Sequence, residues 1–149
     1  MTEQRNLHER KKPVMLIYCC NCLKDVEATQ VTGEQAYPHL PSLFLKRFWS
    51  CPHCGNFVGA HERGPLVGQP FGVIATPELK RLRQQIHNLI DPLWKIMRID
   101  RKLIYKKMSD AVGKEYHTGE IRSIEEAHAA LEHARKINHY YIYGKGSKQ

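Results

Sequence analysis

Four of the five cysteines in this 149-residue chain fall into two pairs whose spacing suits a metal ion. Cys19 and Cys22 form one Cys-x-x-Cys motif, and Cys51 and Cys54 form the other. Two intervening residues allow a tight turn that points both sulfurs at one centre, so two such motifs can supply four thiolates to a tetrahedral Zn²⁺. We predict one structural Zn²⁺ at these cysteines, because four protein ligands leave no open coordination position for catalysis.

Other residues near these motifs offer alternative ligands. Cys20 competes with Cys19 for the first position, although only Cys19 has the two-residue spacing to the next cysteine. His39 or His61 could replace a cysteine, whereas His53, inside the second motif, is expected to be exposed. The non-metal alternatives are a redox-active pair and buried cysteines without a metal. Two pairs, neither of which opens a helix, argue against the redox alternative.

The segments that flank these motifs have the composition of short strands. Gly55 follows the second motif and relieves the backbone where it turns toward the thiolates, whereas Leu23 follows the first. The residues between the motifs also include a loop at 33–41 that contains one glycine and two prolines. The expected strands are residues 13–18, 26–32, 43–49 and 56–61, an order typical of a zinc ribbon.

The following segment predicts an amphipathic helix. Thr76 is a good N-cap and Pro77 stands at the first helical position, where its missing N–H costs nothing. Apolar residues then recur at spacings of three and four, at Leu79, Leu82, Ile86, Leu89 and Leu93. Pro92 interrupts the pattern, so we expect a break there, with Asp91 capping a fresh helix.

Two further helices are expected, and together these elements predict an α+β protein. One runs from about Asp100 to Val112 and ends at Gly113, and another opens at the Ser123–Glu126 capping box and runs to about Ile137. The predicted fold is an N-terminal zinc ribbon of short antiparallel strands packed on a C-terminal bundle of three to four helices. Its parts are a flexible arm at 1–12, the ribbon at 13–62, a connecting loop at 63–76, a helical subdomain at 77–138 and a flexible basic tail at 139–149.

Positive charge is concentrated in the middle of the chain. The formal net charge is +8, and residues 77–107 carry nine Lys or Arg against three Asp or Glu. Such a segment suits a polyanion, so DNA or RNA is the expected partner, although a basic helix face can also be merely solvated. Tyr140, Tyr141 and Tyr143 could stack on bases or pack on the core. The candidate phosphate-binding residues are Lys80, Arg81, Arg83, Lys95, Arg98, Arg101, Lys102, Lys106 and Lys107.

Nothing in the sequence predicts a membrane segment or a secretory signal. No apolar run approaches the roughly 18–20 residues that a membrane helix needs. Residues 1–12 are polar, and no apolar stretch with a cleavage site follows them. The expected location is therefore the cytoplasm, with no membrane partner.

Several short strings after the first cysteine motif form a recognisable set. They are 49–61 (WSCPHCGNFVGAH), 64–66, 76–79, Arg83, His87, 91–95 (DPLWK), Arg101, Tyr105 and His117-x-Gly119. Together they resemble a family of small zinc-finger-containing proteins of bacteriophages and prophages, and the resemblance extends over roughly residues 14–137. The family is a domain of unknown function. The resemblance therefore implies a zinc site and a phage-like origin, with the host cell cytoplasm as location, but no activity.

Three functions fit these observations. The leading hypothesis is a phage-type accessory or regulatory protein that binds nucleic acid through its basic helices. The alternative is an adaptor or inhibitor that docks on a host or phage enzyme. A metal-dependent nuclease that uses His87 and Asp91, with His61 and His117 as other polar candidates, fits less well. Asp91 reads better as an N-cap and Trp94 as a core residue, so no catalytic residue is assigned.

Overall fold

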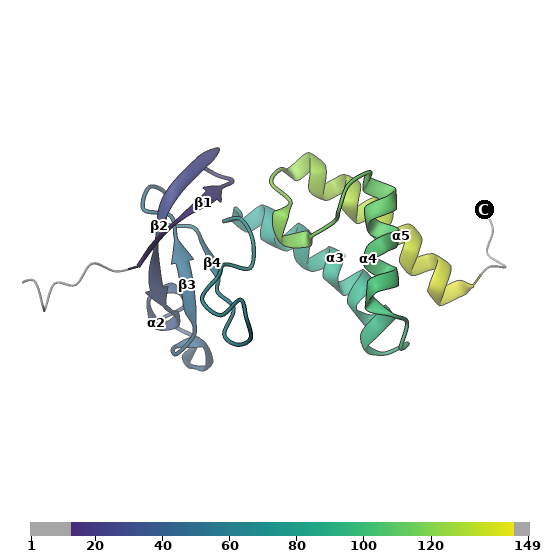
Figure 1. Ribbon diagram of the computed structural model, residues 1–149, viewed down its shortest axis with the longest axis horizontal. Coiled ribbons are helices and arrows are strands. Elements are labelled where there is room, and N and C mark those ends of the chain that lie inside the picture. Colours follow the sequence, from purple (N-terminus) through teal and green to yellow (C-terminus); the bar gives the residue numbers. More distant parts are fainter. Residues whose placement is uncertain (1–12, 145–149) are drawn as a thin grey trace, which may run out of the picture. The chain divides into compact units, whose positions relative to one another are not determined.

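The chain forms two compact units, one ending at Ile74 and the other beginning at Ala75. The structure, a computed structural model, describes residues 13–144, and each unit is considered by itself. The first unit is built from strands and the second from helices (Figure 1), which confirms the predicted α+β class. The predicted arm at residues 1–12 and the last five residues of the predicted tail lie outside the described residues.

The first unit is a four-stranded antiparallel sheet in the order β1-β2-β3-β4. Its strands are β1 (Val14–Cys19), β2 (Lys24–Thr32), β3 (Arg47–Ser50) and β4 (Phe57–Gly59). Cys19 pairs with Lys24, and Ser50 pairs with Phe57. Each Cys-x-x-Cys motif therefore lies where one hairpin turns, and the sheet brings the two hairpins together.

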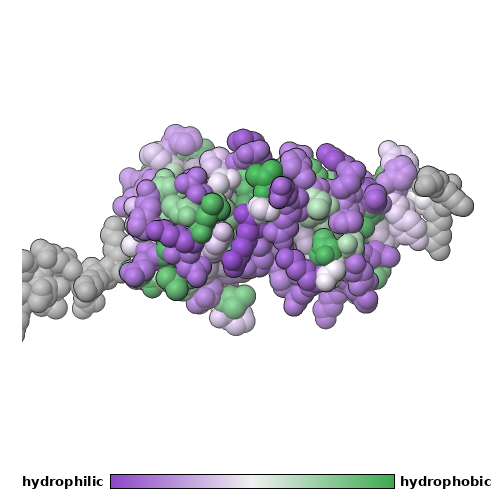
Figure 2. All heavy atoms as spheres, turned by 90° about the horizontal axis from the view of Figure 1, so that it is seen from above, coloured by the Kyte–Doolittle hydropathy of each residue, from purple (hydrophilic) through white to green (hydrophobic). Residues whose placement is uncertain are grey.

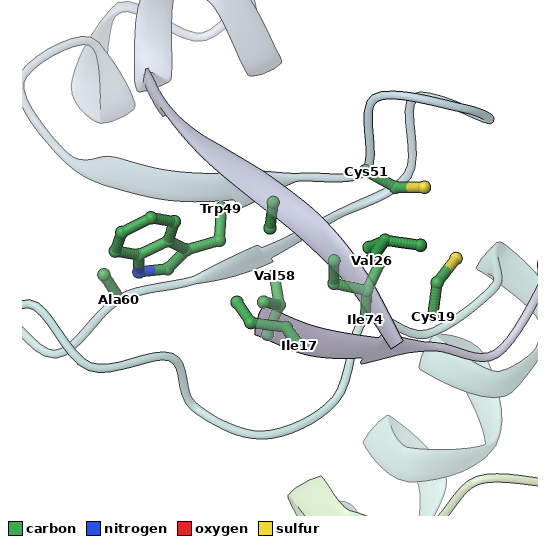
Figure 3. Close-up of a cluster of buried hydrophobic side chains, with 9 residues drawn as sticks. Ile17, Cys19, Val26, Trp49, Cys51, Val58, Ala60 and Ile74 are labelled. Atoms are coloured by element: carbon green, nitrogen blue, oxygen red, sulfur yellow. The ribbon is translucent and has the colours of Figure 1, made fainter. Parts of the chain in front are cut away.

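One face of this sheet carries the core of the first unit (Figure 3). Alternation along β2 puts Val26 and Ala28 on the buried face of the sheet. Trp49 is buried beside them, and its Nε1 donates a hydrogen bond of 2.9 Å to the carbonyl oxygen of Gly68. The two most buried cysteines, Cys19 and Cys51, belong to the same cluster, so the metal-binding motifs are continuous with the apolar core.

The connection between β2 and β3 contains more local structure than the expected loop. A one-turn helix, α2 (Gly33–Ala36), begins at Thr32, whose side chain accepts from the backbone of Gln35 while the Gln35 side chain accepts in return. A β-carbon at residue 33 would overlap the carbonyl oxygen of Leu43, so this turn requires glycine. A 3₁₀ turn (Pro41–Leu43) follows, and it delays the expected strand at 43–49 until Arg47.

The segment after β4 folds back onto the sheet. The backbone of His61 exchanges hydrogen bonds with Gly68 and Gln69, closing a loop. Ile74 then forms a parallel bridge with Cys19, in which its N–H bonds to Tyr18 and its carbonyl accepts from Cys20. Much of the predicted connecting loop is thus bonded into the first unit, next to the first cysteine motif.

Three helices make up the second unit. They are α3 (Pro77–Lys95), α4 (Arg101–Val112) and α5 (Ile124–Tyr143), with a 3₁₀ turn (Thr118–Glu120) before the last. Thr76, Asp100 and Ser123 each accept an N-cap hydrogen bond, and Gly113 ends α4 in the left-handed conformation, at φ 84°. These cap signals were all readable in the sequence.

The buried residues of α3 follow the predicted periodicity with one change. Leu79, Leu82, Ile86 and Leu93 are buried, but Ile90 replaces Leu89 as the fifth core position. Leu89 is half-buried, and its carbonyl accepts a 2.8 Å hydrogen bond from the side chain of Asn138. The core of the second unit is completed by residues of the other two helices.

The expected helix break at Pro92 is wrong, because α3 continues through it to Lys95. Proline lacks the backbone N–H that would bond to the carbonyl oxygen four residues earlier, so that carbonyl loses its helical partner. Only one further turn of helix follows Pro92, so the loss is confined to that carbonyl. Asp91 is consequently not an N-cap. It lies on the helix one turn after His87, with Nδ1 and the carboxylate 3.2 Å apart.

The last helix is longer than expected, since α5 reaches Tyr143 where the sequence predicts an end near Ile137. The first residues of the predicted tail are therefore helical.

Within the described residues, none of the helices is both long enough and apolar enough to cross a bilayer. Hydrophilic side chains predominate on the face drawn in Figure 2, with apolar residues scattered among them.

Tyr116 makes the stability of the second unit depend on pH in the alkaline range. Burial raises the pKa of Tyr116 to about 12, although the hydroxyl of Thr118, 2.8 Å away, acts in the opposite direction. A tyrosine in the unfolded chain has a pKa near 10. The stability that the protonated Tyr116 contributes is therefore fully present below about pH 10 and is lost as the pH rises toward 12. A difference of about two pH units corresponds to roughly 3 kcal/mol.

We expect Tyr116→Phe to flatten the alkaline limb of the stability curve, measured by urea unfolding of the helical signal between pH 8 and pH 12. At neutral pH the variant should lose about 1 kcal/mol, the contribution of one hydrogen bond. Tyr143→Phe, at an exposed position, is the control and should keep the wild-type slope. An unchanged alkaline loss in Tyr116→Phe would contradict this assignment.

Candidate metal centre

The sulfurs of Cys19, Cys22, Cys51 and Cys54 all lie within 4.8 Å of one another. The Cys19–Cys54 sulfurs are 3.6 Å apart and the Cys22–Cys51 sulfurs 3.7 Å apart. Among residues 13–144 this is the one group of three or more Cys, His, Asp or Glu side chains whose ligand atoms come together. The structure thus gathers the four thiols that the sequence singles out.

The spacing of the sulfurs fits zinc. A tetrahedron with Zn–S bonds of about 2.3 Å has edges of about 3.8 Å between sulfurs. The separations of 3.6 Å and 3.7 Å are close to that edge length, before any adjustment around an ion. Four thiolates are also the donor set that structural Zn²⁺ prefers, and they leave no position for a reactive water. The site is therefore a structural zinc centre.

Both motifs have the same backbone geometry. The N–H of Leu23 donates to the carbonyl of Cys19 at 2.8 Å, and the N–H of Gly55 donates to the carbonyl of Cys51 at 3.0 Å. The residue after each motif is left-handed, with φ of 60° at Leu23 and 81° at Gly55. The first motif adopts this turn without glycine, so it carries strain that the second lacks.

The thiols differ in acidity before metal binds. Burial, together with the neighbouring thiols of Cys51 and Cys19, raises the pKa of Cys22 to about 12. Burial also dominates at Cys19 and raises its pKa. At Cys51 burial is outweighed by N–H groups of Cys54 and His53, which lower the pKa to about 7. Zinc must displace the remaining protons, so its affinity falls as the pH falls.

The alternative ligands lie outside this cluster. Cys20 is buried and its N–H bonds to Ile74, but its sulfur is not among the four that converge. His53 is exposed, and its backbone N–H donates to the sulfur of Cys51 at 3.4 Å. The ring centroids of His61 and Phe71 are 4.4 Å apart, with the two planes tilted by 52°, and the ring centroids of His39 and Tyr37 are 6.4 Å apart.

An antiparallel ribbon whose two hairpins share a four-cysteine centre defines a zinc-ribbon protein. Over residues 12–137 the sequence matches the family model of a zinc-finger-containing domain, and the chain belongs to this family. Searches of curated proteins and of solved structures each gave no match. The predicted family and the single structural zinc are thereby confirmed.

Lys80 and Arg83, two of the nine predicted phosphate-binding cations, are half-buried in the helical unit, as is Lys107. Arg83 donates through Nη2 to the carbonyl oxygens of Gly119, at 3.0 Å, and Ile121, at 2.7 Å. Burial lowers the pKa of Lys80, and the nearby charge of Arg83 lowers it further. Arg83 is thus occupied in fixing the loop before α5.

Three other cations contact groups of their own unit. Lys106 pairs with Asp110 at 3.2 Å, and Lys95 lies 3.9 Å from Asp91. Lys107 lies over two tyrosine rings, 5.7 Å from the centroid of Tyr140 and 5.9 Å from that of Tyr141. These contacts leave the Lys95 and Lys106 side chains exposed to solvent.

The remaining four are exposed, and three of them form no ion pair with another described residue: Arg81, Arg98 and Lys102. The fourth, Arg101, lies over two aromatic rings, 5.2 Å from the centroid of Trp94 and 4.4 Å from that of Tyr105. Lys95 lies 5.1 Å from the same Trp94 ring. The sequence predicts Trp94 as a core residue, but its side chain is half-buried and has two cations close to its ring.

This aromatic and cationic group was missed by the sequence reasoning. Trp94 belongs to α3 and Arg101 to α4, so the contact depends on the turn that joins the helices. The spacing of four between Arg101 and Tyr105 was the available signal, because such residues share one face of a helix. The His87–Asp91 pair shares a face for the same reason, but within the described residues no third metal-ligating atom joins it.

Removal of zinc should unfold the first unit and spare the second. Zinc binding to small structural sites supplies on the order of 10–16 kcal/mol, which here would stabilise the ribbon alone. The measurement is amide dispersion in ¹H–¹⁵N spectra before and after chelation. We expect loss of the signals of β1–β4 and retention of those of α3–α5. Cys54→Ser should reproduce the loss, and Cys20→Ser should not. Retained β-strand signals without metal would contradict this expectation.

Leu23→Gly should stabilise the zinc-loaded protein. The left-handed conformation costs a non-glycine residue about 1–2 kcal/mol, and glycine costs about 0.5–1 kcal/mol in chain entropy. Leu23 is 73% exposed, so little apolar burial is lost. The expected gain is up to about 1 kcal/mol in denaturant unfolding of the ribbon, and Gly55→Ala should move stability in the opposite direction. A destabilised Leu23→Gly protein would show that its side chain contributes more than its strained backbone costs.

Proposed function

We propose that the helical unit binds DNA or RNA at the corner between α3 and α4, and that the zinc ribbon is a structural module of the same protein. The observation that carries this proposal is that both Lys95 and Arg101 lie within 5.2 Å of the centroid of the Trp94 ring. We define the α3–α4 corner as Trp94, Lys95, Arg98, Arg101, Lys102 and Tyr105.

Charge at the corner favours a polyanion. Residues 95–102 contain four cations and one acid, Asp100. The carboxylate of Asp100 accepts the N-cap hydrogen bond from Lys102 at 2.9 Å, which occupies one of its oxygens. Closely spaced, exposed cations neutralise phosphates and release condensed counterions, and this supplies most of the affinity of sequence-independent binding.

The aromatic rings add a second kind of contact. The guanidinium of Arg101 lies over both Trp94 and Tyr105. Rings of this kind can stack on bases of a single strand, and arginine beside them contributes cation–π attraction. The combination fits an unpaired strand better than the closed stack of a duplex.

The turn between the helices supports a fixed corner. Arg98 has a φ of 64°, and the N–H of Ile99 returns to the carbonyl of Leu93 at 3.0 Å. A left-handed arginine costs about 1–2 kcal/mol relative to an ordinary conformation. Strain of this sort is often retained where it positions a functional side chain. Here the left-handed conformation would position the Arg98 side chain at the α3–α4 corner.

The biological setting follows from the resemblance to phage and prophage proteins. We propose an accessory or regulatory factor that acts in the cytoplasm of the host cell. The contacts that the α3–α4 corner offers are charges and ring faces, so its binding would depend on phosphates and stacking and not on a particular base sequence.

An adaptor function is the second candidate, and the first unit offers a specific observation in its favour. Leu45 is 96% exposed, and Val67 is 58% exposed. Both line one hollow of about 270 Å³, together with Arg47, His61, Glu62 and Gly68. Exposed apolar side chains beside a polar rim are typical of protein contacts, so a host or phage protein would dock here.

Salt-dependent binding of labelled oligonucleotides tests the nucleic-acid proposal. Fluorescence anisotropy with single-stranded DNA, duplex DNA and RNA should give affinities that fall steeply with salt. The Arg98→Gln/Lys102→Gln double variant should bind more weakly and lower the salt slope by about two. The matched control is Lys24→Gln/Lys46→Gln, which removes the same charge from the ribbon. Absence of binding at low ionic strength, or equal weakening by both double variants, would refute the proposal.

A further inference from the structure

A cavity of about 520 Å³ lies within the helical unit, apart from the α3–α4 corner. It is lined by the C-terminal end of α4, by residues 114–121 and by the N-terminal half of α5. Its volume falls in the range of about 300–1,000 Å³ that is usual for small-molecule sites. None of the nine predicted phosphate-binding residues lines it.

The loop that forms one wall of this cavity is pinned from several sides. The two hydrogen bonds from Arg83 hold Gly119 and Ile121. The N–H of Tyr116 donates to Ser109 Oγ at 3.0 Å, and the hydroxyl of Thr118 donates to that of Tyr116. A wall with this many fixed points is preformed, so a ligand would not have to order it on binding.

The inner surface of the cavity is apolar. Tyr116, Ile121 and Ala130 are buried residues that line it, and Val112 is half-buried there. These side chains come from α4, from the loop and from α5, and they can cover the apolar part of a ligand.

The rim of the cavity carries a surplus of carboxylates. Glu115, Glu120 and Glu126 line it, against a single lysine, Lys114. Lys114 is paired with Glu126 at 3.1 Å, and Glu115 lies 3.0 Å from the ring of His117. Glu120 forms no ion pair within residues 13–144, so the charge that remains for a ligand to meet is negative.

We propose that this cavity binds a small amphipathic amine, with its apolar body against Ile121 and Ala130 and its ammonium group at Glu120. An ammonium would form a charge-assisted hydrogen bond with the carboxylate. An anion of the same shape would meet like charge, and a neutral ligand would gain only the apolar contact. This ligand preference is opposite in sign to that of the α3–α4 corner, and it does not depend on the proposed function.

Three probes of one size and different charge test the proposal: 2-phenylethylamine, 2-phenylethanol and 3-phenylpropanoate. Each is titrated into the zinc-loaded full-length protein and followed by ¹H–¹⁵N shifts of residues 111–133. We expect saturable binding of the amine, at least tenfold weaker binding of the alcohol and weaker binding still of the anion. Equal affinities for the three, tighter binding of the anion, or no saturable shift would overturn the proposal.

Variants locate the binding within the cavity. Glu120→Gln should remove the preference for amine over alcohol, whereas Glu132→Gln, whose carboxylate pairs with Arg135 outside the lining, should leave it unchanged. Ala129→Leu fills the mouth from an exposed position and should weaken all probes at least tenfold. Unchanged selectivity in Glu120→Gln, or unchanged affinity in Ala129→Leu, would place the ligand elsewhere and refute the assignment.

A further probe distinguishes the two sources of such an amine. Nα-acetyl-lysine N-methylamide represents a lysine side chain that a partner protein presents. Tighter binding of this probe than of 2-phenylethylamine would assign the cavity to a lysine side chain, and the reverse would assign it to a free aryl or alkyl amine. Nucleic-acid binding by Glu120→Gln and Ala129→Leu should equal that of the wild type.

Discussion

Four sulfurs within 4.8 Å of one another can all be deprotonated only if a cation lies among them. This constraint determines how the first unit is held together, because each pair of sulfurs lies at the turn of one hairpin. Zinc therefore joins β1–β2 to β3–β4. Ile74, bridged to Cys19, ties the returning loop to the same point. The apolar cluster around Trp49 continues to the buried cysteines, so metal and core stabilise one another.

The second unit depends on apolar packing and on one half-buried cation. The buried face of α3 and the residues of α4 and α5 that complete the core need no metal. Arg83 holds the loop before α5 through two carbonyl oxygens. With that loop fixed, the unit presents a basic, aromatic corner and a separate cavity rimmed by carboxylates. The two proposed ligands, which are opposite in charge, would then bind to separate parts of this unit.

Much of this arrangement was readable from the sequence where local rules decide the outcome. The two-residue spacing of the cysteines predicted the zinc centre, and Thr76, Asp100, Gly113 and Ser123 marked helix ends. The break expected at Pro92 was wrong because a local rule gives the cost of a proline inside a helix but not the stabilisation from buried neighbours. Here Ile90 and Leu93, on either side of it, are both buried in the core. The contacts of Arg83 with Gly119 and of Trp94 with Arg101 were not predicted, because they join residues 36 and 7 positions apart across turns that sequence patterns do not position.

X-ray absorption at the zinc edge of the full-length protein tests the central claim most directly. The account predicts one zinc per chain in a shell of four sulfurs at about 2.3 Å, with no nitrogen or oxygen ligand. The same shell should persist in Cys20→Ser and lose one sulfur in Cys19→Ser. A shell with fewer sulfurs, a histidine ligand in the wild type, or a protein that folds its ribbon fully without bound metal would contradict it.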